Sequence, residues 1–145
     1  MAILRIDPLL DLNTVLPIKE RIIKTYGTQV KDTRTLKSVF NTNQGYRTCK
    51  FPTIEVEGGL QLDTKCRYFT EDIPYGLCIL KDLAQIMNVH TPAIDSIITF
   101  HQKFMNVKYI KDGRLIPEML EKTGCPSKYG IKTPMDLIKR ARFEF

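Results

Sequence analysis

Apolar side chains recur at spacings of three and four along most of the chain, which gathers them on one face of a helix. The longest such stretch runs from Arg67 to Met87, with apolar positions at Ile73, Leu77, Leu80, Leu83, Ala84 and Met87. Thr70 is a suitable N-cap for this helix, and Glu71 and Asp72 would then lie in its first turn, where the helix dipole favours carboxylates. Pro74 is tolerated in a first turn. The pattern predicts a buried helix with a charged start that can face a cleft.

Capping residues mark further helices. Asp32 is expected to cap a helix over residues 33–40, with Leu36, Val39 and Phe40 turned inward. Thr91-Pro92 is an N-cap followed by proline at the first helical position, which begins a helix that continues to Met105. Other predicted helical segments are a short turn within residues 3–12, then 18–26 ended by Gly27, 117–122 closed by Gly124, and a last amphipathic helix from Thr133-Pro134 through Met135, Leu137, Ile138 and Ala141.

The helix that begins at Pro92 carries one of the two histidines on its apolar side. Its predicted buried positions are Ile94, Ile97, Ile98, Phe104 and Met105, and His101 falls on the same stripe. A single histidine on an apolar face is more often a core residue with its hydrogen bonds satisfied than a catalyst, so we interpret His101 as structural. His90 precedes Thr91-Pro92 in a loop, and we assign it no chemistry.

Two stretches break the helical pattern. Residues 41–66 contain loop-forming Asn41, Asn43 and Gly45, and Thr53–Glu57 alternates in polarity, which predicts a short strand or extended arm before Gly58-Gly59. Such a connection is either a plain surface hairpin or a substrate-facing loop. Asp112-Gly113 is a hairpin signal within residues 109–115. The chain is therefore predicted to be mainly α, with five or six helices and at most a small hairpin.

Length and composition indicate an ordinary globular chain. With 145 residues, 43% of them hydrophobic, the chain is one domain by default, able to bury a single core. No apolar run approaches the roughly 20 residues that span a bilayer. Asp7 and Asp11 interrupt the apolar N-terminal run, so a signal peptide is not predicted and a cytoplasmic location is expected.

The four cysteines do not form a metal-binding pattern. Cys49, Cys66, Cys78 and Cys125 are separated by 17, 12 and 47 positions, and the two histidines add no zinc-type spacing. We expect reduced thiols and no metal site. Cys78 lies within the predicted central helix, where it is expected to serve as a small apolar side chain.

The net charge of +6 and the pI of about 9.2 favour anionic partners, such as carboxylates, a dinucleotide pyrophosphate or nucleic acid. Basic residues are spread along the chain, and Lys139-Arg140-x-Arg142 is the densest cluster, so a solvated surface is favoured over nucleic-acid binding. There is no G-x-G-x-x-G loop after a strand and no set of serine, histidine and acid typical of a hydrolase. The sequence predicts no dinucleotide-binding domain within this chain.

Four short motifs occur in a distinctive order. They are Asn43-x-Gly45-Tyr46, the run Arg67-Tyr68-Phe69-Thr70-Glu71-Asp72-Ile73-Pro74-x-Gly76-Leu77, Thr91-Pro92-x-x-Asp95, and Lys128-Tyr129-Gly130-Ile131. Together they resemble the helical C-terminal domain of opine dehydrogenases, in the octopine and tauropine dehydrogenase branch, over residues 30 to the end. The resemblance implies a single helical substrate-binding domain over residues 1–145, similar to the C-terminal domain of 6-phosphogluconate dehydrogenase.

Opine dehydrogenases join the amine of an amino acid to an α-keto acid, commonly pyruvate, and reduce the resulting imine. The resemblance implies NAD(H) or NADP(H) as cofactor, bound mainly by an N-terminal Rossmann domain that this sequence lacks. It also implies that Rossmann domain and both substrates as partners, with no nucleic acid and no membrane, and it leaves a homodimer open. The isolated chain is expected to be inactive.

Site residues are carried over by motif. The family uses a histidine and aspartate pair at the domain interface; the aspartate corresponds to Asp72, whereas the histidine belongs to a segment that would precede residue 1. Arg67 corresponds to an arginine that reaches the cofactor pyrophosphate, and Glu71 and Tyr75 are weaker candidates for binding substrate. For Arg67 the alternative is a surface ion pair with Asp63 or Glu71. The alternative function for the whole chain is that of a non-enzymatic helical interaction module.

Overall fold

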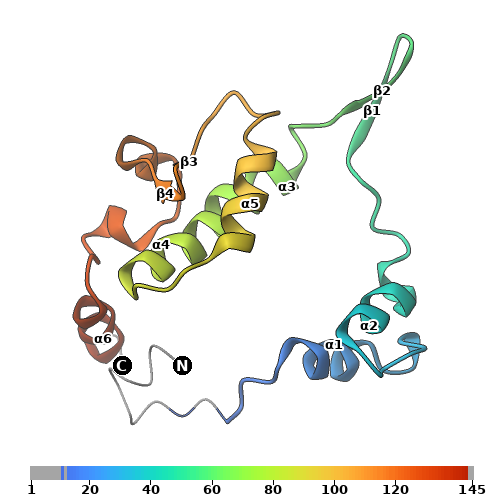
Figure 1. The fold of residues 1–145 in the computed structure, drawn as a ribbon, viewed down its shortest axis with the longest axis horizontal. Helices are drawn as coiled ribbons and strands as arrows, with labels where there is room; N and C mark the ends of the chain where they lie inside the picture. The colour runs from blue at the N-terminus through green and yellow to red at the C-terminus, as the bar shows by residue number, and fades with distance from the viewer. Residues whose placement is uncertain (1–10, 12, 144–145) are drawn as a thin grey trace. The chain divides into compact units, whose positions relative to one another are not determined.

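The structure, a computed structural model, describes residues 11 and 13–143, with side chains as far as Arg140. Its described part divides into two compact units, one ending at Phe51 and the other beginning at Pro52 (Figure 1). Six α-helices and two short hairpins account for most of the regular structure within the described residues, so the mainly α prediction is confirmed. The predicted turn in residues 3–12 lies outside the described residues, apart from Asp11.

The unit that ends at Phe51 is built on two helices. Its elements are α1 (Ile18–Tyr26), a 3₁₀ helix (Gly27–Gln29), α2 (Leu36–Thr42) and a second 3₁₀ helix (Gln44–Tyr46). Three buried side chains, Ile22, Val30 and Val39, form its core. The prediction for α1 is confirmed, and Gly27, with φ of +52°, provides its C-terminal end. A residue without Cβ adopts this conformation at little cost, which is why glycine commonly ends helices.

The predicted cap of α2 is wrong. Thr35, not Asp32, caps the helix: its hydroxyl accepts from the Ser38 amide at 3.0 Å, and the Ser38 hydroxyl accepts in return from the Thr35 amide, also at 3.0 Å. Asp32 instead binds the Arg34 guanidinium at 2.7 Å. With its start three residues later than predicted, α2 turns Val39 fully inward but leaves both Leu36 and Phe40 exposed.

The motif Asn43-x-Gly45-Tyr46 has a packing role in this unit. The Asn43 side chain accepts a hydrogen bond from the Gly45 amide at 2.9 Å. A Cβ on Gly45 would lie 2.6 Å from the Tyr26 ring, so only glycine lets the loop approach that ring. The rings of Tyr26 and Tyr46 pack edge to face, with centroids 5.0 Å apart. The motif therefore closes α2 back onto α1.

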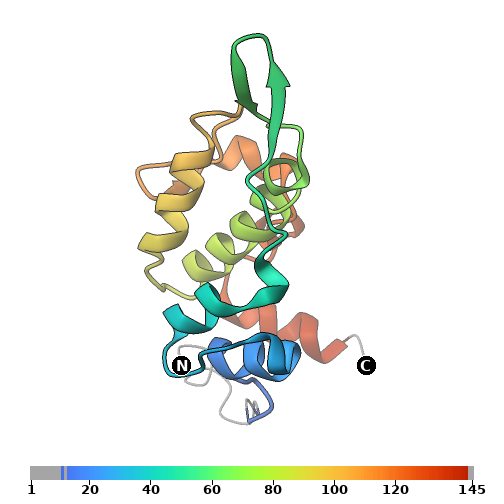
Figure 2. The same ribbon diagram turned by 90° about the vertical axis from the view of Figure 1, so that its right-hand side faces the viewer.

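The unit that begins at Pro52 contains most of the helices. In chain order its elements are β1 (Thr53–Val56), β2 (Gly59–Leu62), α3 (Arg67–Thr70), a π-helical turn (Ile73–Leu77), α4 (Cys78–Ile86), α5 (Pro92–His101), β3 (Ile110–Lys111), β4 (Arg114–Leu115), two 3₁₀ helices (Pro117–Lys122 and Pro126–Tyr129) and α6 (Pro134–Phe143). Helices α4 and α5 lie side by side, and the hairpin of β1 and β2 projects away from them (Figures 1 and 2). The hairpin predicted at Asp112-Gly113 is confirmed, and the strand predicted at Thr53–Glu57 is present as β1. Because β1 pairs with β2, the structure contains two hairpins where at most one was predicted.

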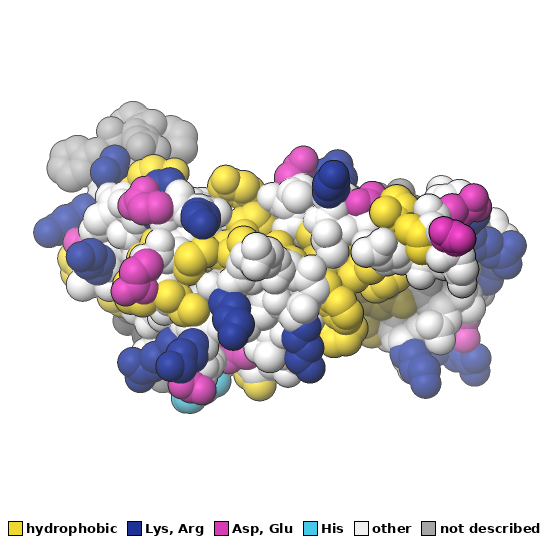
Figure 3. Space-filling view, turned by 90° about the horizontal axis from the view of Figure 1, so that it is seen from above, with side chains coloured by type: hydrophobic (Ala, Val, Ile, Leu, Met, Phe, Trp, Pro, Cys, Tyr) yellow, Lys and Arg dark blue, Asp and Glu magenta, His cyan; other side chains and the backbone are white. Residues whose placement is uncertain are grey.

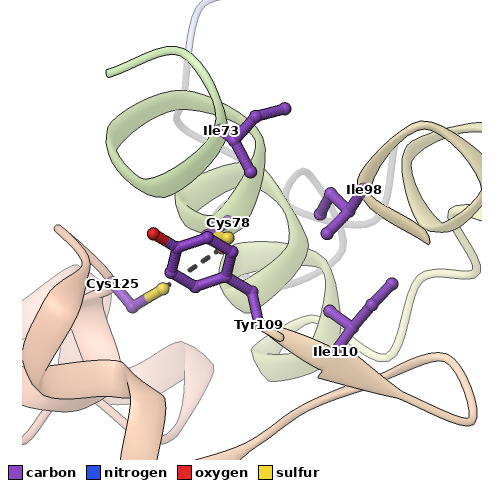
Figure 4. Packing of buried hydrophobic residues seen from close by; sticks show 6 residues of the cluster. All are labelled: Ile73, Cys78, Ile98, Tyr109, Ile110 and Cys125. Atoms are coloured by element: carbon purple, nitrogen blue, oxygen red, sulfur yellow. Dashed lines mark hydrogen bonds between the residues drawn. The ribbon is translucent and has the colours of Figure 1, made fainter. Parts of the chain in front are cut away.

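The core of this unit lies where α4, α5 and the β3–β4 hairpin meet (Figure 4). Its buried members are Ile73, Cys78, Ile98, Tyr109, Ile110 and Cys125. The Cys125 thiol donates to the Cys78 carbonyl at 3.3 Å, and burial raises the pKa of the Cys78 thiol to about 12. Cys78 is thus an apolar core side chain, as predicted, and all four cysteines are free thiols.

The single continuous helix predicted to begin at Thr70 does not form. Helix α3 begins at Arg67, so Thr70 ends it instead of capping the next helix. Pro74 lacks an amide hydrogen, and its ring would collide with the Thr70 carbonyl in a regular α-helix. The backbone widens instead: the Asp72 amide donates to the Arg67 carbonyl at 3.0 Å, and the Leu77 amide to the Asp72 carbonyl at 2.8 Å. Both bonds join residues five apart, as in a π-helix.

This extra residue per turn changes which side of α4 is buried. Ile73 and Cys78, five positions apart, both face the core. Leu80, predicted to be buried, is 52% exposed, whereas Lys81 and Asp82 are buried. The predicted stripe assumed a uniform helical period, and the π-turn shifts the phase of every residue that follows it.

Helix α5 is shorter than predicted. It ends at His101, not Met105, and Ile98 is its one fully buried side chain. Ile97 and Phe104, both predicted to be inward, are exposed. His101 is half-buried; its Nδ1 hydrogen bonds to the Ile97 carbonyl at 2.8 Å and its ring packs on Phe69. His101 therefore has hydrogen-bond and packing partners within the fold, which is what the structural interpretation expects.

Two buried charged residues tie α4 to its neighbours. The Lys81 ammonium lies 2.6 Å from the Asp95 carboxylate on α5. The Asp82 carboxylate accepts from the amide and the hydroxyl of Ser127, at 2.7 and 2.6 Å. Each buried charge has strong partners, which offsets the cost of removing it from water.

Candidate functional site

The four residues predicted for the site lie together on the segment that joins α3 to α4. Arg67 begins α3, Glu71 and Asp72 follow its end, and Tyr75 lies within the π-turn. All four are exposed at a place where neighbouring Phe69, Ile73 and Pro74 are buried. The segment thus uses its apolar residues for the core and presents its polar residues to solvent.

The backbone explains why these side chains share a face. The Arg67 carbonyl accepts from the amides of both Glu71 and Asp72, at 2.8 and 3.0 Å, and the Glu71 carbonyl accepts from the Tyr75 amide at 2.8 Å. Residues four or five apart therefore lie above one another along this widened turn. π-turns are rare and are frequent at functional sites. The geometry brings the predicted residues together in space.

The charged groups of this segment are held loosely. The guanidinium of Arg67 lies 3.5 Å from the Glu71 carboxylate, and their side chains are 69% and 60% exposed. Exposed pairs of this kind contribute about 0–1 kcal/mol, so Arg67 can exchange Glu71 for another anion. The Asp72 carboxylate has no hydrogen bond or ion pair among the described residues. The surface pair proposed as the alternative for Arg67 is present, with Glu71 as its partner.

Tyr75 is placed by the segment that follows the core. A Cβ on Gly124 would lie 3.3 Å from the Tyr75 ring, and the Gly124 amide donates to the Pro74 carbonyl at 3.4 Å. Gly124 therefore packs below the ring while the phenol remains 58% exposed. Tyr75 is thus exposed three positions after Asp72, which is exposed as well.

The other three motifs are used by the fold. Asn43, Gly45 and Tyr46 form the contact with α1 described above. In the second motif, the Thr91 hydroxyl lies 3.2 Å from the Lys81 ammonium, which also binds Asp95. In the third, Gly130, with φ of +81°, ends a 3₁₀ helix, and the Lys128 ammonium donates to the Glu121 carbonyl at 2.8 Å. The Arg67–Leu77 motif differs from these three in that it exposes several charged side chains next to one another, those of Arg67, Glu71 and Asp72.

A pocket at the other end of α4 was not anticipated from the sequence. It has a volume of about 440 Å³ and is lined by Lys81, Asn88, His90, Asp95, Asp112 and Arg114, among others. The residues come from α4, the loop that joins it to α5, α5 itself and the β3–β4 hairpin. No sequence signal joins them, because these separate segments supply between one and three lining residues each.

Other site types find less support in the described residues. Within residues 11 and 13–143, no three His, Cys, Asp or Glu side chains gather closely enough to hold a metal ion. None of the described helices is long and apolar enough to cross a bilayer. On the face shown in Figure 3, lysine and arginine side chains lie in small groups, with Asp and Glu between them.

Comparison with known proteins identifies the family. The model of the NAD/NADP octopine/nopaline dehydrogenase alpha-helical domain matches residues 2–105. This chain belongs to the octopine/nopaline dehydrogenase family. It is 36% identical over 138 residues to the opine dehydrogenase of Haliotis discus hannai, which covers 94% of this chain and 34% of that protein. The octopine dehydrogenase of Pecten maximus is 33% identical over 132 residues, or 91% of this chain and 33% of that protein.

Solved structures agree with this family assignment. Octopine dehydrogenase with NADH and L-arginine superimposes with a TM-score of 0.85 at 31% identity, over 96% of this chain and 34% of that structure. The complex with NADH and agmatine gives a TM-score of 0.85 at 29% identity, over the same shares. The fold expected from the resemblance is confirmed. The chain spans about a third of the length of the octopine/nopaline dehydrogenase relatives that it matches.

Proposed function

We propose that this chain acts as the helical substrate-binding domain of an NAD(P)-dependent opine dehydrogenase, with a Rossmann cofactor domain as its partner. The reaction would condense the amine of an amino acid with an α-keto acid such as pyruvate, release water and reduce the imine to a secondary amine. The observation that carries the proposal is the Arg67–Leu77 segment, which exposes Arg67, Glu71 and Asp72 with no hydrogen bond or ion pair from their side chains to other segments among the described residues. Residues 1–145 would make up this domain.

Asp72 has the properties needed beside a catalytic imidazole. Its carboxylate is exposed and has no hydrogen bond or ion pair among the described residues. A carboxylate that accepts from an imidazole N–H fixes the tautomer of the ring and stabilises the imidazolium while a proton moves. In our proposal the cofactor domain supplies that histidine, and Asp72 orients it.

Arg67 fits a cofactor phosphate. Its guanidinium is 69% exposed and held only by an exposed carboxylate at 3.5 Å. A guanidinium presents a planar pair of donors that matches a pyrophosphate. Bound NADH or NADPH would supply the hydride, and Arg67 would bind its pyrophosphate as the domains close. Glu71 would then be free of Arg67 and, with Tyr75, would border the substrate.

A chimera tests the proposal. This chain would replace the matching third of the Haliotis discus hannai opine dehydrogenase, and NADH oxidation would be followed with pyruvate and a panel of amino acids that includes L-arginine. We expect turnover by the chimera that requires both substrates, and none by the isolated chain. A folded chimera that binds NADH but does not turn over any amino acid would refute the enzymatic proposal and favour the interaction module.

Within an active chimera, Asp72→Asn tests the role of the carboxylate. An amide cannot stabilise an imidazolium, so we expect kcat to fall by about 10²–10⁴-fold, the usual contribution of acid–base catalysis. Glu57→Gln is the matched control, because Glu57 is an exposed acid next to the β1–β2 turn, outside this segment. Unchanged kcat in Asp72→Asn would remove Asp72 from the mechanism.

A further inference from the structure

The pocket at the C-terminal end of α4 has a charge-neutral floor. Lys81 is 5% exposed, and its ammonium lies 2.6 Å from the Asp95 carboxylate and 3.2 Å from the Thr91 hydroxyl. These two partners use two of the three hydrogens of the ammonium. The floor therefore contributes no net charge.

The rim of the pocket carries two charges of opposite sign that have no ion-pair partner among the described residues. Asp112 and Arg114 both line the pocket, are exposed and belong to the β3–β4 hairpin. Although they are only two positions apart, they form no ion pair with each other or with any described residue. The hairpin is fixed to α4, because the Leu115 amide donates to the Gln85 side chain at 3.0 Å. The hairpin backbone thus places a carboxylate and a guanidinium, both without an ion-pair partner among the described residues, on one rim of the pocket.

The backbone of the rim is unusual as well. Among the described residues, Asn88 and Asp112 are the two that adopt positive φ without being glycine, at +52° and +50°, and both line this pocket. Such backbone is costly for residues with a Cβ, although Asn and Asp tolerate it best. At both positions an Asn or Asp is present where glycine would adopt the same backbone conformation at lower energetic cost.

From these observations we propose that the pocket binds a small zwitterion of the α-amino acid class. The ligand carboxylate pairs with Arg114, which suits a bidentate contact, and the ligand ammonium pairs with Asp112. Asn88 and His90 add hydrogen-bonding groups at the rim. A volume of about 440 Å³ accommodates such a molecule, and the polar lining disfavours an apolar ligand.

This site is separate from the segment proposed for catalysis. None of the residues that line the pocket belongs to the Arg67–Leu77 segment. The zwitterion site does not depend on the proposed function, because it needs neither a cofactor domain nor turnover. A bound amino acid here would act as an effector of the domain, not as the reacting substrate.

Titration of the ¹⁵N-labelled chain with L-alanine, propionate and ethylamine tests the proposal by NMR. We expect L-alanine to shift the amides of residues 88–90 and 112–114. Propionate lacks the ammonium and ethylamine lacks the carboxylate, so each should bind at least ~10-fold more weakly. If propionate bound as tightly as L-alanine, the zwitterion assignment would be wrong. If no amide shifted, or if the shifts lay only at residues 67–75, the pocket would not be the site.

Substitutions at the rim test whether Asp112 and Arg114 bind the ligand. Asp112→Asn and Arg114→Gln should each weaken L-alanine binding at least ~10-fold. Asparagine supports the same left-handed backbone, so Asp112→Asn removes the charge without disturbing the turn. Lys111→Gln is the matched control, because Lys111 is an exposed cation of the same hairpin that does not line the pocket. Unaltered affinity in both rim variants would overturn the proposal.

Discussion

Asp82 joins two parts of the second unit that are 45 positions apart in sequence. Its side chain is 3% exposed and lies on α4, and it accepts from the Ser127 amide at 2.7 Å and the Ser127 hydroxyl at 2.6 Å. Asp82→Ala removes both acceptors and leaves two donors of a half-buried residue without their partner. We therefore expect this substitution to lower the free energy of unfolding.

The magnitude follows from the two bonds. A hydrogen bond to a charged group contributes about 1.5–3 kcal/mol, which gives roughly 3–6 kcal/mol for the pair. Because Ser127 is only half-buried, water can replace part of the hydrogen bonding that its amide and hydroxyl lose. We therefore expect Asp82→Ala to lower the free energy of unfolding by about 2–4 kcal/mol. Asp82→Asn should lose about half as much, since its amide can still accept from the backbone and donate to the hydroxyl. Against a usual total of about 5–15 kcal/mol, either change is readily measured.

Urea unfolding followed through the amide resonances of α4 and of residues 127–129 is the assay, because these signals report on this unit alone. A double-mutant cycle with Ser127→Ala should give a coupling energy of about 1–2 kcal/mol for the hydroxyl bond. Leu80→Ala is a control on the same helix; since Leu80 is 52% exposed, its loss should be below about 1 kcal/mol. A loss under about 1 kcal/mol for Asp82→Ala, or zero coupling to Ser127, would refute the reasoning.

Two further predictions concern Gly45 and Asp136. Gly45→Ala would place a Cβ 2.6 Å from the Tyr26 ring and should lower the free energy of unfolding by about 1–3 kcal/mol. Because the clash is with the Tyr26 ring, Gly45→Ala should cost much less in a chain that also carries Tyr26→Ala. An equal loss with and without Tyr26→Ala would contradict the packing argument. The Thr133 hydroxyl and the amides of Lys132 and Thr133 donate to the Asp136 carboxylate and hold its pKa below the usual value of about 3.9. Because the folded pKa is lowered, this stabilisation is present above about pH 4 and is lost as the pH falls through the folded pKa. An NMR titration should show a lowered Asp136 pKa in the unsubstituted chain and a pKa closer to the usual value in Thr133→Val. If the Asp136 pKa of the unsubstituted chain were normal, these hydrogen bonds to its carboxylate would be contradicted.

The sequence by itself determined where most elements lie. Spacings of three and four predicted the helices, Gly27 marked the end of α1, Pro92 the start of α5, and Asp112-Gly113 the β3–β4 turn. These features depend on residues close together in the chain, since capping, turn chemistry and helical period are local. The Arg67–Leu77 motif likewise identified the segment on which Arg67, Glu71, Asp72 and Tyr75 are gathered.

Only the tertiary structure decided which side chains are buried and which polar groups are left free. Pro74 turns one predicted helix into α3, a π-turn and α4, so the phase of the buried face shifts and Leu80 is exposed in place of Lys81. Lys81 and Asp82 fall outside the predicted apolar stripe, yet both are buried, because Asp95 and Ser127 from other segments bind their charged groups. The pocket beside them is formed in the same way. Local rules fix the backbone of each element, but burial depends on partners that packing alone brings together.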